Sequence, residues 1–107
     1  MFGRPESAHI ATYTGCTACT AIITDTEIIC ANSGDSRCVL SVDGKALDMS
    51  VDHKPDNIGE RTRIERAGGF VEESRVKGVL ALSRALGDFE YKKNKFVGIE
   101  EQMVTCI

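Results

Sequence analysis

Asp35 has the side-chain type and the setting that best suit a metal ligand in this sequence. It ends a run of four turn-forming residues, 32–35, that lies between two apolar stretches. Rigid strands on either side of a tight turn can hold a carboxylate at a fixed place on a sheet edge, which metal coordination requires. The alternative is an ordinary turn aspartate that hydrogen-bonds its own backbone, and the local sequence by itself favours this alternative.

Three further residues require a choice between chemistry and structure. Asp88 follows Gly87 at the end of an apolar stretch and allows the same two interpretations as Asp35. Asp52 and His53 could act as a carboxylate–imidazole pair, but neighbouring residues of an extended chain point to opposite faces. We therefore expect His53 to have a structural role.

Phosphate binding and nucleophilic catalysis have weaker signals. Arg37, Arg75 and Arg84 carry the charge needed to hold a phosphate group, although scattered arginines are usually surface charges. The sequence contains no glycine-rich phosphate loop, no nucleophile elbow and no paired-histidine motif. Chemistry that depends on a protein nucleophile is therefore not indicated.

The five cysteines are an odd number and cannot all pair in disulfides. Cys16 and Cys19 have the spacing of a redox or zinc motif, but a structural zinc site normally needs a second such pair. Cys30 and Cys38 are eight positions apart and do not supply it. We therefore expect the cysteines to pack as small apolar side chains, and a thiol or metal role for Cys16 and Cys19 is the alternative.

The elements that must position these residues begin with four predicted strands. Four stretches are apolar or β-branched and are separated by short polar turns: 17–24, 27–31, 37–42 and 45–51. Asp43 and Gly44 are a two-residue hairpin signal, because both central positions of a type I′ turn need positive φ. The pattern predicts an antiparallel meander of four strands.

A helical pattern follows the predicted strands. Asn57 and Glu60 have the spacing of a capping box, which predicts a helix over residues 58–67 on the surface of the sheet. Gly68 and Gly69 end it, because glycine readily adopts the positive φ found just past a helix.

We predict different structures for the two ends of the chain. Residues 1–13 show no clear period and are expected to be a loose lead-in, which leaves residues 14–107 for the folded domain. A short hairpin is predicted within residues 70–76, and residues 96–107 are expected to be extended. The stretch 102–107 resembles a strand that stops in mid-run, which favours a piece of a longer protein.

Composition excludes several classes of protein. With 13 Lys and Arg against 16 Asp and Glu, the net charge is −3, whereas a nucleic-acid binder needs a basic excess. The longest apolar runs have four residues, far short of the ~20 that a membrane span needs, and the first residues contain no signal-peptide core. We expect a soluble intracellular protein, cytoplasmic or nuclear, that binds neither nucleic acid nor membrane.

Five segments resemble, in order and in spacing, the motifs of metal-dependent serine/threonine protein phosphatases of the 2C type (the PPM family): 14–18 (TGCTA), 31–37 (ANSGDSR), 52–55 (DHKP), 63–69 (RIERAGG) and 82–89 (LSRALGDF). The resemblance covers about residues 14–107. It implies an α+β fold in which the antiparallel meander and its flanking helix form part of an α/β/β/α two-sheet sandwich. It also implies Mn²⁺ or Mg²⁺ as cofactor, and phosphoserine and phosphothreonine in phosphoprotein substrates.

The chemistry implied by this resemblance needs no protein nucleophile. Two divalent ions bridged by a water lower the pKa of that water and hold the phosphoryl oxygens. By resemblance, Asp35 is a ligand associated with a third, weaker metal. The other matched residues belong to motifs that look structural in the family: Gly15, Gly34, Asp52, His53, Gly87 and Asp88.

Family members also carry an upstream Asp-Gly-His-Gly segment and a downstream Asp-Gly and late Asp-Asn that complete the metal site. No Asp-Gly-His-Gly occurs in this sequence, and its single Asp-Gly, at 43–44, fits a hairpin turn. We therefore assign no catalytic residue and expect the chain alone to be inactive or nearly so. The alternative is a phosphatase-like module that binds or regulates without turnover.

Part of a two-layer sandwich exposes apolar sheet faces or strand edges, and such surfaces seek partners. We therefore expect a homodimer, a strand-exchanged assembly or poor solubility of this chain.

Overall fold

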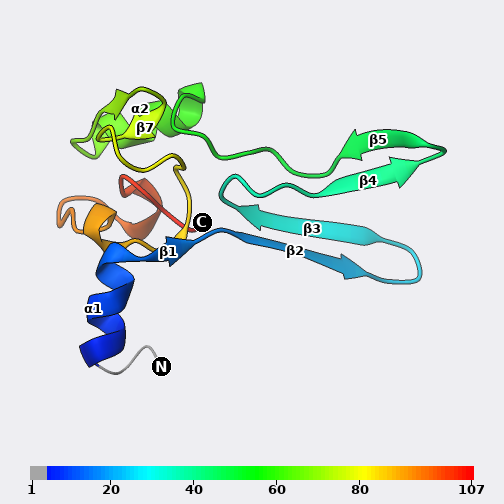
Figure 1. Cartoon of the computed structure of the whole chain (residues 1–107), viewed down its shortest axis with the longest axis horizontal. Helices are drawn as coiled ribbons and strands as arrows, with labels where there is room; N and C mark the ends of the chain where they lie inside the picture. The colour runs from blue at the N-terminus through cyan, green and yellow to red at the C-terminus, as the bar shows by residue number, and fades with distance from the viewer. Residues whose placement is uncertain (1–4) are drawn as a thin grey trace.

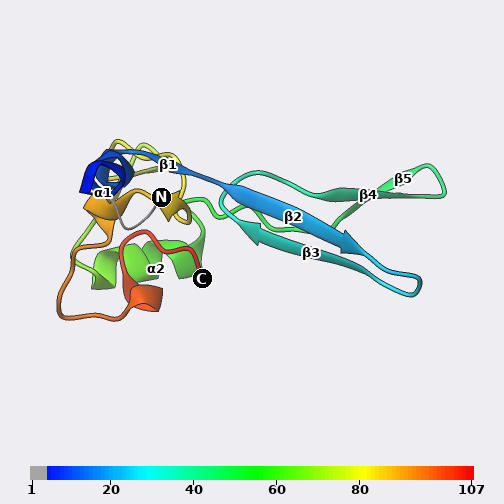
Figure 2. The ribbon, with the colours of Figure 1, turned by 90° about the horizontal axis from the view of Figure 1, so that it is seen from below.

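Two long β-hairpins form one end of the molecule, and an α+β part with the buried core forms the other (Figures 1 and 2). The computed structural model describes residues 5–107, with side chains from His9 onward. Its extents are 46 × 34 × 21 Å. In the described part of the chain, residues 5–107, every named strand pair is antiparallel and one isolated bridge is parallel, which agrees with the α+β class expected from the sequence.

The first hairpin pairs β2 (Ala18–Ile23) with β3 (Ile28–Ser33), in a register that places Ile23 opposite Ile28. β-Branched side chains favour such a pleated ladder. The Thr24 hydroxyl accepts a hydrogen bond of 3.0 Å from the backbone N–H of Glu27, which closes the turn.

The second hairpin pairs β4 (Val39–Val42) with β5 (Lys45–Asp48). Its turn residues Asp43 and Gly44 have φ of 51° and 77°. Both values are positive, as a type I′ turn requires, so the turn predicted at this dipeptide is confirmed.

The four strands do not form the single meander that we predicted. Within residues 5–107, β2–β3 and β4–β5 are separate two-stranded sheets. The reason lies in the connection between them. The backbone N–H of Gly34 donates to His53 Nδ1 and its carbonyl accepts from the His53 N–H, so these groups do not continue a ladder toward β4.

The two hairpins face each other as layers. Ile23 and Ile28 of the first hairpin line one cavity together with Leu40 and Met49 of the second. Both views show the hairpins projecting side by side from the same end of the molecule (Figures 1 and 2).

The remaining elements form the other part of the molecule: α1 (Pro5–Tyr13), β1 (Gly15–Cys16), α2 (Ile58–Arg66), β6 (Val71–Glu72), β7 (Arg75–Val76), β8 (Leu86–Gly87), and the 3₁₀ turns η1 (Phe89–Tyr91) and η2 (Ile99–Glu101). Its core consists of Ile64, Val76, Ala85 and Val104, each fully buried. The short hairpin predicted within residues 70–76 is present as β6 and β7.

Helix α2 starts and ends close to the predicted positions, but its capping differs. Asn57 is the N-cap residue without a side-chain capping bond, because its amide donates instead to the Asp52 carbonyl. The capping box predicted with Glu60 is therefore wrong. At the other end, Gly68 has φ of 90° and ends the helix as expected.

The two ends of the chain differ from our expectations. Residues 5–13, expected to be loose, form α1, which contacts η1 and β8, and such tertiary contacts can stabilise a helix that lacks a clear apolar period. The rest of that lead-in, residues 1–4, lies outside the described residues. Residues 96–107, expected to be extended, are interrupted by η2, and residues 102–107 form an isolated bridge between Thr105 and Arg84 in place of a strand.

Within residues 5–107, no helix has the length and apolar character needed to cross a bilayer.

Candidate functional site

The turn that carries Asp35 is held by backbone geometry and by one histidine ring. Gly34 has φ of 118°, and a Cβ at this position would lie 2.5 Å from the Thr17 side chain. Its N–H donates to His53 Nδ1 at 3.0 Å, and its carbonyl accepts from the His53 N–H at 2.9 Å. The hairpins therefore present Asp35 at a fixed place.

His53 works here as a neutral hydrogen-bond acceptor. Burial, together with the nearby charge of Arg84, lowers the pKa of the ring. Nδ1 can accept from Gly34 only when it carries no proton, so the neutral ring is the form that holds the turn. His53 and Asp52 point to different partners and form no carboxylate–imidazole pair.

The carboxylates beside this turn are already paired with basic side chains. Asp35 Oδ2 lies 2.6 Å from Lys54 Nζ. Arg37 donates hydrogen bonds to both carboxylate oxygens of Asp52, at 2.8 and 3.1 Å. These hydrogen bonds from a charged group lower the pKa of Asp52. Lys54 as the partner of Asp35 was not predicted, although both belong to matched motifs.

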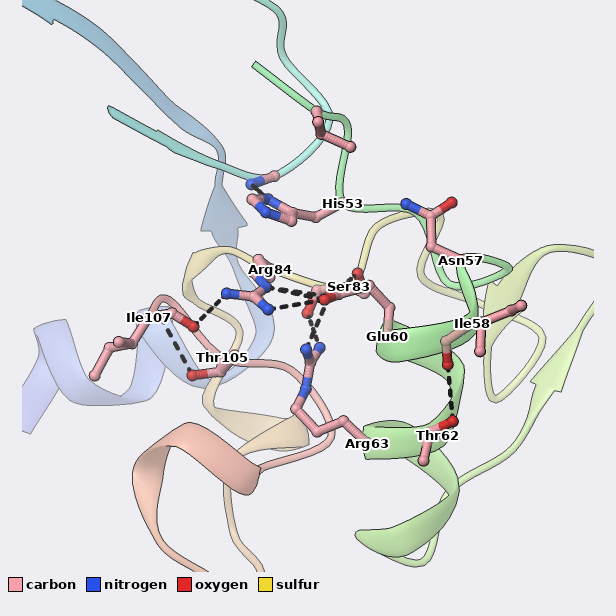
Figure 3. A network of polar contacts seen from close by, with 12 residues as sticks. His53, Asn57, Ile58, Glu60, Thr62, Arg63, Ser83, Arg84, Thr105 and Ile107 are labelled. Atoms are coloured by element: carbon pink, nitrogen blue, oxygen red, sulfur yellow. Dashed lines mark hydrogen bonds and ion pairs between the residues drawn. The ribbon is translucent and has the colours of Figure 1, made fainter. Parts of the chain in front are cut away.

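A second cluster centres on the buried carboxylate of Glu60 (Figure 3). Ser83 Oγ donates to Glu60 Oε2 at 2.6 Å, Arg63 Nη1 donates to Oε2 at 2.8 Å, and Arg84 Nη2 donates to Oε1 at 2.8 Å. Burial alone would raise the pKa of Glu60, but the hydrogen bonds from Arg84, Ser83 and Arg63 outweigh it and lower the pKa to about 2.

The two arginines extend this cluster to the backbone. Arg63 Nη2 donates to the Ser83 carbonyl at 2.6 Å and Nε donates to the Gln102 carbonyl at 3.0 Å. Arg84 Nη1 donates to the Ile107 carbonyl. Glu60 joins α2 to the segment of Ser83 and Arg84, and its two arginine partners extend the connection to residues 102–107. The contacts of Arg84 are therefore structural in this chain.

The signal for this cluster was present in the sequence. Glu60 lies four residues before Ile64 and therefore on the buried face of α2, where a charge needs a partner. We interpreted Glu60 as half of a capping box instead. The two other arginines considered for phosphate have partners as well, since Arg37 pairs with Asp52 and Arg75 donates to the Val79 carbonyl.

Asp88 lies where β1 pairs with β8, apart from the Asp35 turn. Its N–H donates to the Thr14 carbonyl, and a Cβ on Gly15 would collide with its carboxylate. The same crowding applies to Gly87, whose Cβ would lie 2.5 Å from the Thr14 carbonyl oxygen. Burial raises the pKa of the Asp88 carboxyl. Gly15, Gly87 and Asp88 together form a close backbone crossing, not a ligand set with Asp35.

The described residues do not fit a metal centre by themselves. Within residues 5–107, no group of three or more His, Cys, Asp or Glu side chains is placed to hold a metal ion. Asp35 is therefore a single candidate ligand with an ammonium group beside it, whereas hard divalent cations take several oxygen ligands.

Comparison with known proteins places the chain in a family. Residues 3–107 match the family model described as PP2C, protein phosphatase 2C. The chain belongs to the protein phosphatase 2C family. The resemblance found in the sequence is thereby confirmed.

Relatives in this protein phosphatase 2C family are close in sequence. Probable protein phosphatase 2C 6 of Paramecium tetraurelia is 56% identical over 105 residues, which cover 98% of this chain and 35% of that protein. Protein phosphatase 2C homolog 2 of Saccharomyces cerevisiae is 52% identical over 97 residues, which cover 89% of this chain and 21% of that protein. The chain thus spans about a third or less of the curated relatives it matches.

The fold comparison agrees with the family. A crystal structure of a phosphatase from Toxoplasma gondii matches with a TM-score of 0.71 and 46% identity, covering 75% of this chain and 25% of that chain. The phosphatase 2C motif at 31–37 forms the Asp35 turn, and the motif at 52–55 supplies His53, which holds that turn by hydrogen bonds to Gly34. The motifs at 63–69 and 82–89 supply the hydrogen-bond partners of Glu60.

Proposed function

We propose that this chain forms the central part of a phosphatase domain that hydrolyses phosphoserine and phosphothreonine in protein substrates. The observation that supports the proposal most is the family match over residues 3–107. The turn at Asp35, which hydrogen bonds between Gly34 and His53 hold in place, also supports the proposal. A catalytic scaffold needs such a rigid turn to keep a side chain at a fixed place on a sheet edge.

We further propose that the chain by itself turns over no substrate. Mn²⁺ or Mg²⁺ is the cofactor implied by the family, but the described residues supply no cage of oxygen ligands for it. Asp35 pairs with Lys54, Asp52 with Arg37, and Glu60 with two arginines. The role assigned to this chain is to hold the core and the Asp35 turn, and Asp35 is its one candidate ligand, of the third-metal type.

Two preparations test these proposals together. In the first, the purified chain is assayed with a phosphothreonine peptide and excess Mn²⁺, and we expect no release of phosphate above the blank. In the second, residues 3–107 replace the matching segment of the Saccharomyces cerevisiae protein phosphatase 2C homolog 2, and we expect the chimera to release phosphate.

The control for the chimera is its Asp35→Asn variant. We expect a loss of activity of about tenfold or more, the scale seen when a residue that supports a metal site is removed. A chimera that folds but shows no activity contradicts the phosphatase proposal. Robust turnover by the chain alone contradicts the proposal that it is incomplete.

A further inference from the structure

Ser83 is the residue at which the Asp35 turn and the Glu60 cluster meet. It is fully buried, and its backbone N–H donates to the His53 carbonyl at 3.1 Å. Its hydroxyl donates to Glu60 Oε2 at 2.6 Å, and its carbonyl accepts from Arg63 Nη2 at 2.6 Å. Each polar group of Ser83 therefore has a partner, and these partners belong to both groups of contacts.

The segment that contains Ser83 also lies against the turn itself. A Cβ on Gly34 would lie 3.0 Å from the Arg84 carbonyl oxygen. His53, which is hydrogen-bonded to Gly34, lies beside the Glu60 cluster on the side of the hairpins (Figure 3). Residues 83–84 therefore support the turn through His53 and through direct packing on Gly34.

Three hydrogen bonds connect helix α2 with the residue next to Asp35. Glu60 on α2 accepts from Ser83 Oγ at 2.6 Å, and the Ser83 N–H donates to the His53 carbonyl at 3.1 Å. The His53 ring in turn accepts from the Gly34 N–H at 3.0 Å. Ser83 and Gly34 are buried, and a close-packed interior transmits a displacement from one residue to the next.

We propose that Ser83 is a positioning residue whose hydroxyl, bound to Glu60, sets the place of the turn that carries Asp35. Ser83 acts on Asp35 through His53 and Gly34. The inference rests on the proposed function for the purpose of the Asp35 turn. The connection from Ser83 to Gly34 is a property of the folded chain and is measured without any activity.

A role in stability alone is the alternative for Ser83. The hydroxyl would then only satisfy the buried carboxylate of Glu60, and its removal would lower the free energy of unfolding. The turn would keep its place in the molecules that remain folded. The two roles therefore differ in the state of the hydrogen bond between Gly34 and His53 in folded protein.

The first test measures this hydrogen bond by nuclear magnetic resonance in the purified chain, at a pH where His53 is neutral. The scalar coupling across the bond, between the Gly34 nitrogen and His53 Nδ1, reports its geometry. We expect this coupling in the unmodified chain. In Ser83→Ala, which keeps the backbone N–H but lacks the hydroxyl, we expect the coupling to be lost and the Gly34 amide proton to shift upfield.

Thr105→Val is the matched control, because it removes another buried hydroxyl. Thr105 is 1% exposed and its hydroxyl donates to the Ile99 carbonyl at 3.0 Å, so this variant should keep the coupling. Ser83→Cys is a second variant of nearly the same size, with a thiol that is only a weak donor, and it should weaken the coupling.

Two outcomes of this measurement overturn the proposal. The first is full coupling in folded Ser83→Ala, or in Ser83→Cys should the alanine variant fail to fold. The second is an equal loss of coupling in Thr105→Val.

The second test places Ser83→Ala in the chimera described above. We expect phosphate release to fall several-fold. In the Asp35→Asn chimera the same change should have no further effect, because a residue that acts through Asp35 has nothing to position once Asp35 is lost. Equal fold losses in both backgrounds contradict the proposal. An inactive chimera contradicts the proposed function alone, and the coupling measurement then decides the role of Ser83.

Discussion

His53 is a motif residue whose contacts in the structure hold a turn in place. Its Nδ1 accepts the Gly34 N–H and so fixes the turn that carries Asp35. The sequence predicts a structural role for His53, because adjacent residues of an extended chain diverge. The partner was not predictable, since it lies 19 positions away and depends on how the chain folds back.

The neutral form of His53 gives a stability that depends on pH. Its pKa lies below the ordinary 6.5, so this contribution is fully present above pH 6.5 and is lost as pH falls below that value. The variant His53→Asn keeps an acceptor near the Nδ1 position but cannot take up a proton. We expect urea unfolding of this variant to depend less on pH below 6.5 than unfolding of the unmodified chain.

The exposed His9 supplies the control for this measurement. A His9→Asn variant should keep the pH dependence of the unmodified chain. Equal pH dependence in the unmodified chain and in His53→Asn would contradict the role assigned to His53.

At the scale of elements, strands and turns with local signals were predicted well. The hairpin turn at Asp43 and Gly44 and the end of α2 at Gly68 follow from backbone conformations that few residue types adopt. Elements that depend on distant contacts were missed. Helix α1 rests against η1 and β8, and the break between β3 and β4 depends on His53.

The contacts of Glu60 lead to a prediction about how α2 is attached. We expect Glu60→Gln to lower the free energy of unfolding by roughly 3 kcal/mol, because two arginines lose their counter-charge in a buried setting. The pKa of Glu60 is about 2 against an ordinary 4.5, so the stability it contributes is present above pH 4.5 and is lost as pH falls toward 2. Urea unfolding as a function of pH measures both effects.

Glu65 provides a matched control on the same helix. It pairs with Arg61 at the exposed surface, so Glu65→Gln should change the free energy of unfolding by less than about 0.5 kcal/mol. If Glu60→Gln is as mild as Glu65→Gln, the buried cluster does not hold α2 in place.

At the scale of the whole molecule, the core lies at one end and the hairpins extend from it with apolar side chains exposed. Ile22 and Ile29 pair across the outward face of the first hairpin, with exposed fractions of 61% and 47%. The sequence pattern indicated strands that bury such residues, but it contains no information on what covers them. We propose that a second copy of the chain covers this face.

This proposal predicts a dimer whose population rises with concentration. Replacing Ile22 by Lys places a charge on that face and should shift the chain to monomer, as measured by sedimentation equilibrium. The control Ile58→Lys changes a side chain that is 86% exposed on α2 and should leave the dimer intact. A chain that is monomeric at every concentration would rule out this assembly.

The central claim is that this chain belongs to a metal-dependent phosphatase family but does not hold a two-metal centre by itself. Titration with Mn²⁺ followed by electron paramagnetic resonance tests it most directly. We expect at most one weakly held ion for each chain, and Asp35→Asn should remove it. Two tightly held Mn²⁺ ions for each chain, bound by its own side chains, would show that the chain does form a two-metal centre.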